Sequence, residues 1–194
     1  MKYNRKSIRL KGYNYAQAGL YFITICTHNR EHLFGQIING EMVLNNAGRV
    51  AVKCWQDIPA HFPMATLHEY VVMPNHVHGI IEIISPKNEL LSVGANDHST
   101  QNDHTDNNRA NGNSPLRITS FRSPSQSIGS IIRGFKIGVT KWFRYENGFA
   151  QNTQVWQRNY YEHIIRNDAE YNRIANYILN NPAKWDDDRF YTGY

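Results

Sequence analysis

The sequence VVMPNHVHGII, residues 71–81, places two apolar runs on either side of a Pro74-Asn75 break. Short β-branched and aliphatic runs that are bounded by turn residues are typical of buried strands. We therefore expect strands over Leu67–Met73 and His76–Ile84, joined by a tight connection. This unit of strand, connection and strand forms the centre of the predicted fold.

His76 and His78 open the second of these strands. Side chains alternate between the two faces of a strand, so both imidazoles are expected on one face while Val77 points to the other. Two imidazoles about one ladder step apart can share a divalent cation. An exposed or hydrogen-bonded histidine pair would have the same spacing, so the pattern by itself leaves metal binding open.

Other strands are indicated on both sides of this unit. Leu20–Thr27 is β-branched and aromatic and predicts a buried strand, and Leu33–Ile38 predicts a short one before an Asn39-Gly40 turn. A strand-like patch at Val155–Gln157 precedes the aromatic stretch Tyr160–Ile165.

Helical patterns occupy three segments. One starts at Asn46 and ends at Pro59, one covers Ile128–Tyr145, and the last is capped by Asn167 and stopped by Asn181-Pro182. On one side of the first helix we expect Val50, Cys54 and Ile58. The resulting order is strand, helix, strand, strand, helix, strand and an added C-terminal helix. It predicts an α+β fold with a ferredoxin-like split βαβ sheet.

Length and composition fit a single domain. The chain has 194 residues, 41% of them hydrophobic and 19% charged, with a net charge of +5. We expect one domain over residues 1–194 with a polar, flexible insertion at about 86–127, in which His98 and His104 are solvated loop residues. Because no apolar run approaches a membrane span and no signal segment follows Met1, we expect a cytoplasmic protein with no membrane partner.

Cys26 and Cys54 lack the spacing of a zinc knuckle or a disulfide framework, so we interpret them as small buried side chains. The moderately basic charge balance permits a polyanionic partner. Basic residues decorate the polar side of the helix predicted over 128–145, where they would either follow phosphates or only solvate the helix. They are Arg133, Lys136, Lys141 and Arg144.

Tyr177 and Asn181 are four residues apart on the last helix and therefore share one face. On the helix pattern alone, Tyr177 is a boundary residue that buries its ring and exposes its hydroxyl. A carboxamide oxygen one turn away that serves as a third metal ligand would instead make the hydroxyl a plausible nucleophile.

Several separated motifs resemble a known family. They are VVMPNHVHGII at 71–81, IIRGFKIGVTKW at 131–142, VWQRNYYEHIIRN at 155–167 and ANYILNNPAKW at 175–185. In this order they resemble the REP-associated tyrosine transposases, which are relatives of insertion-sequence transposases in the His-hydrophobic-His superfamily of single-strand endonucleases. The resemblance runs from about Tyr21 to Trp185 and omits the polar insertion.

The resemblance implies that His76 and His78 hold Mg²⁺ or Mn²⁺ and that Tyr177 is the nucleophile. Asn181 falls where relatives often place a third ligand. It also implies cleavage and transfer of single-stranded DNA through a 5′-phosphotyrosine, at palindromic sequences folded as hairpins. A homodimer with composite active sites is one arrangement that it leaves open.

Other residues have weaker assignments. Trp156 and Tyr160 are expected to be exposed aromatics that stack on bases. Tyr160, Tyr161 and Tyr171 rival Tyr177 and are interpreted as packing or DNA-stacking residues. His163 is a loose candidate for the base that deprotonates the nucleophile, although a structural role is favoured.

Two other functions remain open at this stage. A module with a ferredoxin-like sheet could bind single-stranded nucleic acid without cleaving it. A metal hydrolase could activate water at the two histidines with no covalent step. The presence of both histidines together with Tyr177 favours the transposase-like reading, because a protein that only binds needs none of the three.

Overall fold

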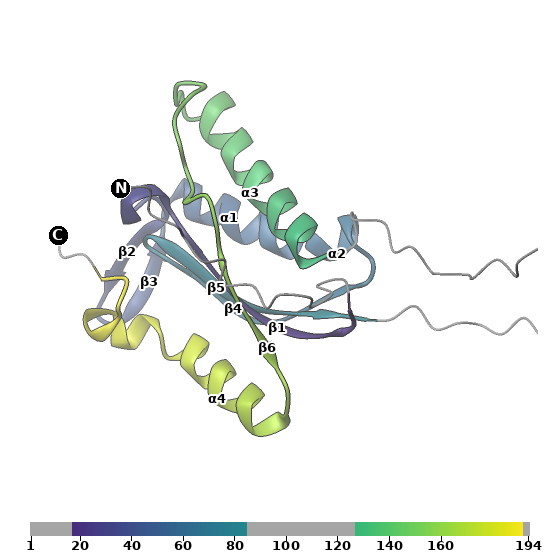
Figure 1. The fold of residues 1–194 in the computed structure, drawn as a ribbon. Coiled ribbons are helices and arrows are strands. Elements are labelled where there is room, and N and C mark those ends of the chain that lie inside the picture. Colours follow the sequence, from purple (N-terminus) through teal and green to yellow (C-terminus); the bar gives the residue numbers. More distant parts are fainter. Residues whose placement is uncertain (1–16, 85–126, 192–194) are drawn as a thin grey trace, which may run out of the picture.

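Four antiparallel strands form the central sheet of the structure, a computed structural model that describes residues 17–84 and 127–191 (Figure 1). Their order across the sheet is β4-β5-β1-β6. They are β1 (Gly19–Cys26), β4 (Ala65–Met73), β5 (His76–Ile83) and β6 (Tyr161–Ile165). The expected insertion at about 86–127, with His98 and His104, lies outside the described residues.

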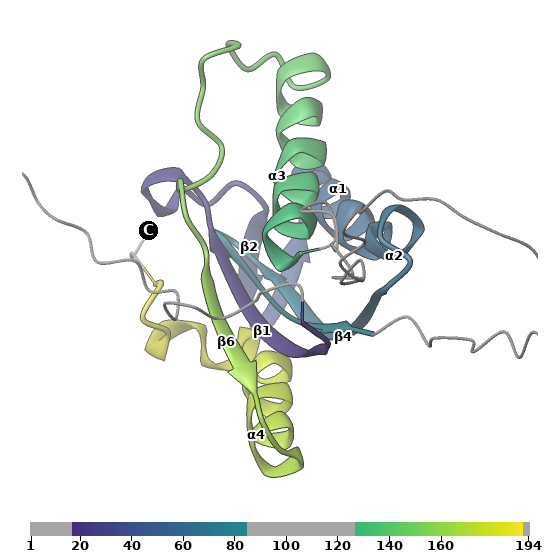
Figure 2. The same ribbon diagram turned by 45° about the vertical axis from the view of Figure 1, so that its right-hand side comes forward.

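Helices cover both faces of this sheet. Figures 1 and 2 show α1, α2 and α3 on one face and α4 on the other. Their bounds are α1 (Asn46–Gln56), α2 (Ile58–His61), α3 (Ile128–Tyr145) and α4 (Asp168–Leu179), and the described residues also form two short 3-10 helices, η1 (His28–Arg30) and η3 (Pro182–Asp187). None of the helices described in this structure is long and apolar enough to cross a membrane.

Strand β5 divides its side chains between the two layers. Val77 and Ile81 join the larger hydrophobic core with α1 and α3. Ile80 joins a smaller core with Ile174 and Ile178 of α4. By the period-two alternation of a strand, His76 and His78 lie on the same face as Ile80, beneath α4.

The chain order β1, α1, β4, β5, α3, β6 produces an interleaved sheet. β1 lies between β5 and β6, and all the pairings are antiparallel. This is the split βαβ arrangement that the order of elements predicts, with α4 added at the C-terminal end. The expected α+β fold class is confirmed.

The predicted buried side of the first helix is correct only for Ile58, which lies at the start of α2, is 2% exposed and belongs to the larger core. Val50 and Cys54 are only partly buried, whereas Ala47, Ala51 and Trp55 face the core. Small residues let α1 approach closely, and a Cβ on Gly48 would lie 2.1 Å from the Phe34 carbonyl oxygen. The prediction gave weight to Val50 over the small residues Ala47 and Ala51, and it did not use Trp55, which directly follows Cys54.

The second predicted strand is half of a hairpin. β2 (Gly35–Ile38) pairs with β3 (Glu41–Leu44), and the Asn39-Gly40 turn between them has positive φ at both residues, 52° and 79°.

The strand-like patch predicted at Val155–Gln157 forms only a single β-bridge, between Trp156 and Thr27. Cys26 and Cys54, expected to be buried, are both half-buried.

Gly79 of β5 provides a test of how tightly this sheet packs. A Cβ at Gly79 would lie 2.3 Å from Cζ2 of the fully buried Trp55. We therefore expect Gly79→Ala to lower the free energy of unfolding by about 1–3 kcal/mol, measured by urea denaturation. Gly134→Ala is the control, since its Cβ would meet only the Phe62 ring at 3.3 Å. Equal stability of the two variants would contradict this packing.

Candidate metal centre and its tyrosine

His76 and His78 are both completely buried, with exposed fractions of 0%. The Nδ1 atom of His78 lies 2.9 Å from the hydroxyl of Thr24, its register partner on β1. The Nδ1 atom of His76 lies 2.9 Å from the Asn75 side-chain oxygen. Because a carboxamide oxygen only accepts, His76 donates from Nδ1 and keeps the Nε2 lone pair for a ligand.

The Asn75 side chain connects three parts of the chain. Its amide group donates to the carbonyl oxygen of Phe190 at 2.8 Å and to that of Arg30 at 3.3 Å. Its oxygen accepts from His76. These bonds orient the His76 ring and also hold the C-terminal segment and η1 beside it.

Helix α4 carries Tyr177 over the histidines. Asn167 caps the helix as expected, accepting from the Glu170 amide at 2.9 Å. One side of α4 packs on the sheet through Ile174 and Ile178. Tyr177, 40% exposed, then places its hydroxyl 3.1 Å from Nε2 of His78.

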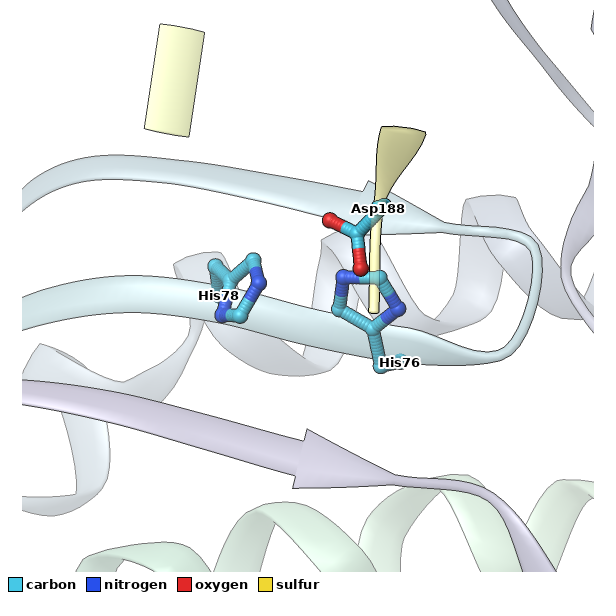
Figure 3. A group of neighbouring side chains, drawn as sticks. All are labelled: His76, His78 and Asp188. Atoms are coloured by element: carbon cyan, nitrogen blue, oxygen red, sulfur yellow. The ribbon is translucent and has the colours of Figure 1, made fainter. Parts of the chain in front are cut away.

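Asp188 completes the group from the segment after η3. One of its carboxylate oxygens accepts from the Asn181 amide at 2.7 Å and from the Tyr177 hydroxyl at 3.4 Å. One ligand atom from each of His76, His78 and Asp188 lies within 4.8 Å of the others, and Figure 3 shows the three side chains together. This His-His-Asp group is positioned to bind a metal ion.

Two buried atoms that lack a hydrogen-bond partner among the described residues test whether a metal ion fits the His-His-Asp group. The Nε2 atom of His76 and the Oδ1 atom of Asn181 are buried and have no hydrogen-bond partner among the described residues. Leaving such atoms unpaired is unfavourable, and both are lone-pair donors. A divalent cation accepts from nitrogen and oxygen ligands of this kind, so the donor set fits a divalent metal ion.

Burial sets the protonation of the group. It lowers the pKa of His76 to about 3, against a smaller opposite effect of Asn181, and lowers the pKa of His78 well below its ordinary value. Both imidazoles are therefore neutral at pH 7, as metal ligands must be. Burial and then the Asp188 charge raise the pKa of Tyr177 to about 12, so its hydroxyl is protonated.

The structure brings His76, His78, Tyr177 and Asn181 together, as predicted from sequence. Asp188 was missed by the sequence reasoning. It ends a run of three aspartates, 186–188, which gave the one available signal. Three consecutive acids at the end of a chain usually indicate a solvated segment, and only the tertiary structure selects Asp188 from them.

The basic residues of α3 are not at this centre, because α3 lies on the opposite face of the sheet (Figure 1). Arg133 and Lys141 are exposed, and Arg144 is partly buried. Lys136 is already engaged, since its ammonium group donates to the carbonyl oxygens of Gln157 and Asn159 at 2.7 and 3.0 Å. Burial lowers its pKa to about 8.

The expectation that Trp156 is an exposed, base-stacking aromatic is wrong. Its side chain is only 8% exposed and packs against Phe34 and Phe135. Its indole N–H donates to the carbonyl oxygen of Lys136 at 3.1 Å. Trp156 is therefore a structural residue that joins the chain after α3 to the core.

The rival tyrosines have other surroundings. The Tyr171 hydroxyl donates to Glu69 at 2.7 Å and lies 3.1 Å from the Nδ1 atom of His68. Tyr160 packs against the larger core, and the Tyr161 ring meets Phe22 edge-on at 6.3 Å.

His163 has the Glu170 carboxylate 2.6 Å from its Nε2 atom. This contact connects β6 to the first turn of α4. Asp188 is the carboxylate near the Tyr177 hydroxyl, and the position of His163 fits the structural role favoured for it.

Comparisons with known proteins add three findings. No family model matches the chain. An uncharacterised protein of Haemophilus influenzae is 45% identical over 193 residues, which cover 97% of this chain and 94% of that protein. The solved structure of a REP-associated tyrosine transposase bound to a REP hairpin matches with a TM-score of 0.55 at 17% identity, over 92% of this chain and 74% of that one. At this identity the match shows a common fold.

The buried histidines predict acid sensitivity in the metal-free protein. Below pH 6.5 the unfolded chain binds protons at His76 and His78, while the folded chain keeps both neutral. Unfolding is therefore favoured as the pH falls, by about 2 kcal/mol per histidine at pH 5. Urea denaturation in EDTA at pH 7 and pH 5 measures this loss. The double variant His76→Gln, His78→Gln should show a smaller loss, and an equal loss would refute the assignment.

Proposed function

Since this chain belongs to one family with the Haemophilus influenzae protein and has the fold of a REP-associated tyrosine transposase, we propose that it is a metal-dependent, tyrosine-type DNA transposase. Its reaction would be cleavage and transfer of single-stranded DNA through a covalent 5′-phosphotyrosine. Mg²⁺ or Mn²⁺ is the proposed cofactor.

One observation carries the proposal. The Tyr177 hydroxyl lies 3.1 Å from the Nε2 atom of His78, one of the two buried histidines that form the candidate metal group with Asp188. Tyr177 is exposed enough to meet a substrate, whereas the ligands behind it are buried or partly buried. A protein that only bound DNA would gain nothing from a protonated phenol held against such a group.

His76, His78 and Asp188 would hold the metal, with the Asn181 oxygen as a further ligand. A metal ion bound by these residues would supply charge neutralisation at a non-bridging phosphate oxygen and at the departing oxygen. The Tyr177 oxygen attacks phosphorus in line, the bond from phosphorus to the 3′-oxygen breaks, and the 5′-phosphate stays on the tyrosine. The phenolic proton has an acceptor in Asp188, and the leaving 3′-oxygen takes a proton from solvent.

The proposed substrate is DNA held locally as a single strand, in a hairpin as in the solved transposase complex. An open groove of about 360 Å³ runs beside Tyr177 and gives a strand access to the hydroxyl. Its lining includes Asn176, Asn180 and Lys184, which can donate hydrogen bonds. Arg133 and Lys141, exposed on the other face, are proposed to contact more distant phosphates. Assembly as a homodimer stays a proposal.

Removal of either histidine should separate binding from cleavage. We expect His76→Ala and His78→Ala to abolish cleavage of a labelled single-stranded hairpin in Mn²⁺ while hairpin binding stays within a few-fold, because phosphate contacts dominate affinity. EDTA should have the same effect on the wild type. His163→Gln is the control and should keep cleaving, since His163 contacts Glu170 outside the centre. A histidine-to-alanine variant that cleaves at the wild-type rate would refute the metal centre.

Tyr177→Phe removes one hydroxyl and keeps the ring. We expect cleavage to vanish, DNA binding to remain, and stability to fall by about 1 kcal/mol or less. The wild type should form a DNA adduct that survives denaturation and maps to the peptide with Tyr177. Tyr171→Phe, on the same helix, should still form it. Cleavage without an adduct would indicate a hydrolase, binding without cleavage would indicate a binding module, and an adduct on Tyr171 would move the nucleophile.

A further inference from the structure

We propose that Arg30 and Arg189 form a binding site for the backbone phosphates of single-stranded DNA immediately beside the candidate metal centre. The inference rests on the proposed function and deepens it. It assigns the cations that hold the substrate strand to η1 and to the C-terminal segment, on the same side of the sheet as Tyr177.

Both arginines meet the aromatic ring that covers the histidines. The Cζ atoms of Arg189 and Arg30 lie 4.6 and 5.3 Å from the centroid of the Phe190 ring. That ring lies 4.6 Å from the His76 ring and 5.7 Å from the His78 ring, measured between centroids. The Arg189 guanidinium also lies 5.9 Å from the Tyr161 ring. The two positive charges are therefore one aromatic side chain away from the metal ligands.

The position of Arg30 is fixed by a strained turn. Asn29 and Arg30 have φ angles of 51° and 58°, a left-handed conformation that side chains other than glycine rarely adopt. Hydrogen bonds hold this turn, since the Thr27 hydroxyl donates to the carbonyl oxygens of Glu31 and Asn75 at 2.8 and 3.0 Å. Strain that is held in this way is typical of functional sites.

The backbone of Arg189 is positioned by hydrogen bonds of Phe190 and of its own carbonyl oxygen. The Phe190 amide donates to Asp188 at 2.7 Å, and the Phe190 carbonyl accepts from Asn75. The carbonyl oxygen of Arg189 accepts from the Arg30 guanidinium at 3.0 Å. These hydrogen bonds fix the backbone on both sides of residue 189, whereas the Arg189 side chain is exposed.

Neither guanidinium forms an ion pair with any carboxylate in residues 17–84 and 127–191. The guanidinium groups of Arg30 and Arg189 lie beside the same Phe190 ring and near the candidate site for a metal cation. These positive charges repel one another. A phosphate group supplies the missing negative charge and suits the fork of a guanidinium. A DNA strand that places one phosphate at Tyr177 carries further phosphates along the same surface. The cations of α3, behind the sheet, cannot serve these positions.

Salt dependence of DNA binding tests the proposal without requiring cleavage. The probe is a fluorescein-labelled oligothymidylate of about 20 nucleotides, followed by anisotropy in EDTA between about 50 and 200 mM NaCl. We expect Arg30→Gln and Arg189→Gln each to lower the slope of log affinity against log salt by about 0.7, one phosphate contact each. Arg189→Lys should keep the slope. Arg166→Gln removes the same charge from an exposed position before α4 and should keep the wild-type slope.

Mn²⁺ affinity separates loss of a phosphate contact from loss of structure. Without a nearby cation, Arg30→Gln and Arg189→Gln should bind Mn²⁺ as tightly as the wild type or more tightly. The proposal is overturned if both variants keep the wild-type slope, or if Mn²⁺ and DNA affinity fall together. If the wild type fails to bind the oligonucleotide but binds and cleaves the labelled hairpin, the arginine site is overturned alone, and if it binds neither DNA, the proposed function is overturned along with this site. Wild-type binding with unchanged variant slopes overturns the arginine site alone.

Discussion

The alternation of side chains along β5 is the constraint on which the rest of the structure depends. Val77 and Ile81 must face the core under α1 and α3, and this forces His76 and His78 to the opposite face. A slip of one residue in register would bury the apolar pair against α4 and turn the histidines into the larger core. The hydrophobic core therefore fixes where the two candidate metal ligands lie.

Asn75 extends this constraint to segments far away in sequence. It directly precedes the first histidine, and its carboxamide orients His76 while it holds the backbone of Phe190 and Arg30. The loop after β1 and the chain after α4 are thereby attached to the start of β5. Together with the hydrogen bond from Asn181 to Asp188 and the burial of Phe190, this side chain helps to hold Asp188 and the two arginines beside the histidines.

The site also departs from what stability alone favours. Two neutral histidines are buried side by side, two lone-pair atoms have no partner among the described residues, and the Arg30 and Arg189 cations near them form no ion pair within those residues. Each feature is unfavourable by itself, and each would become favourable if a metal ion and a phosphate bound there, as we propose. Buried features that are unfavourable for the stability of the fold are expected at functional sites.

The sequence by itself determined the strands around Pro74-Asn75, the helix over Ile128–Tyr145, the cap at Asn167 and the shared face of His76 and His78. Those are consequences of local periodicity and capping, which act over a few residues. Tertiary structure alone decided that Asp188 joins the histidines, that Trp156 is buried and that α3 lies behind the sheet from Tyr177. These depend on contacts between segments distant in the chain, and local patterns carry no information about which of several exposed-looking residues such contacts will select.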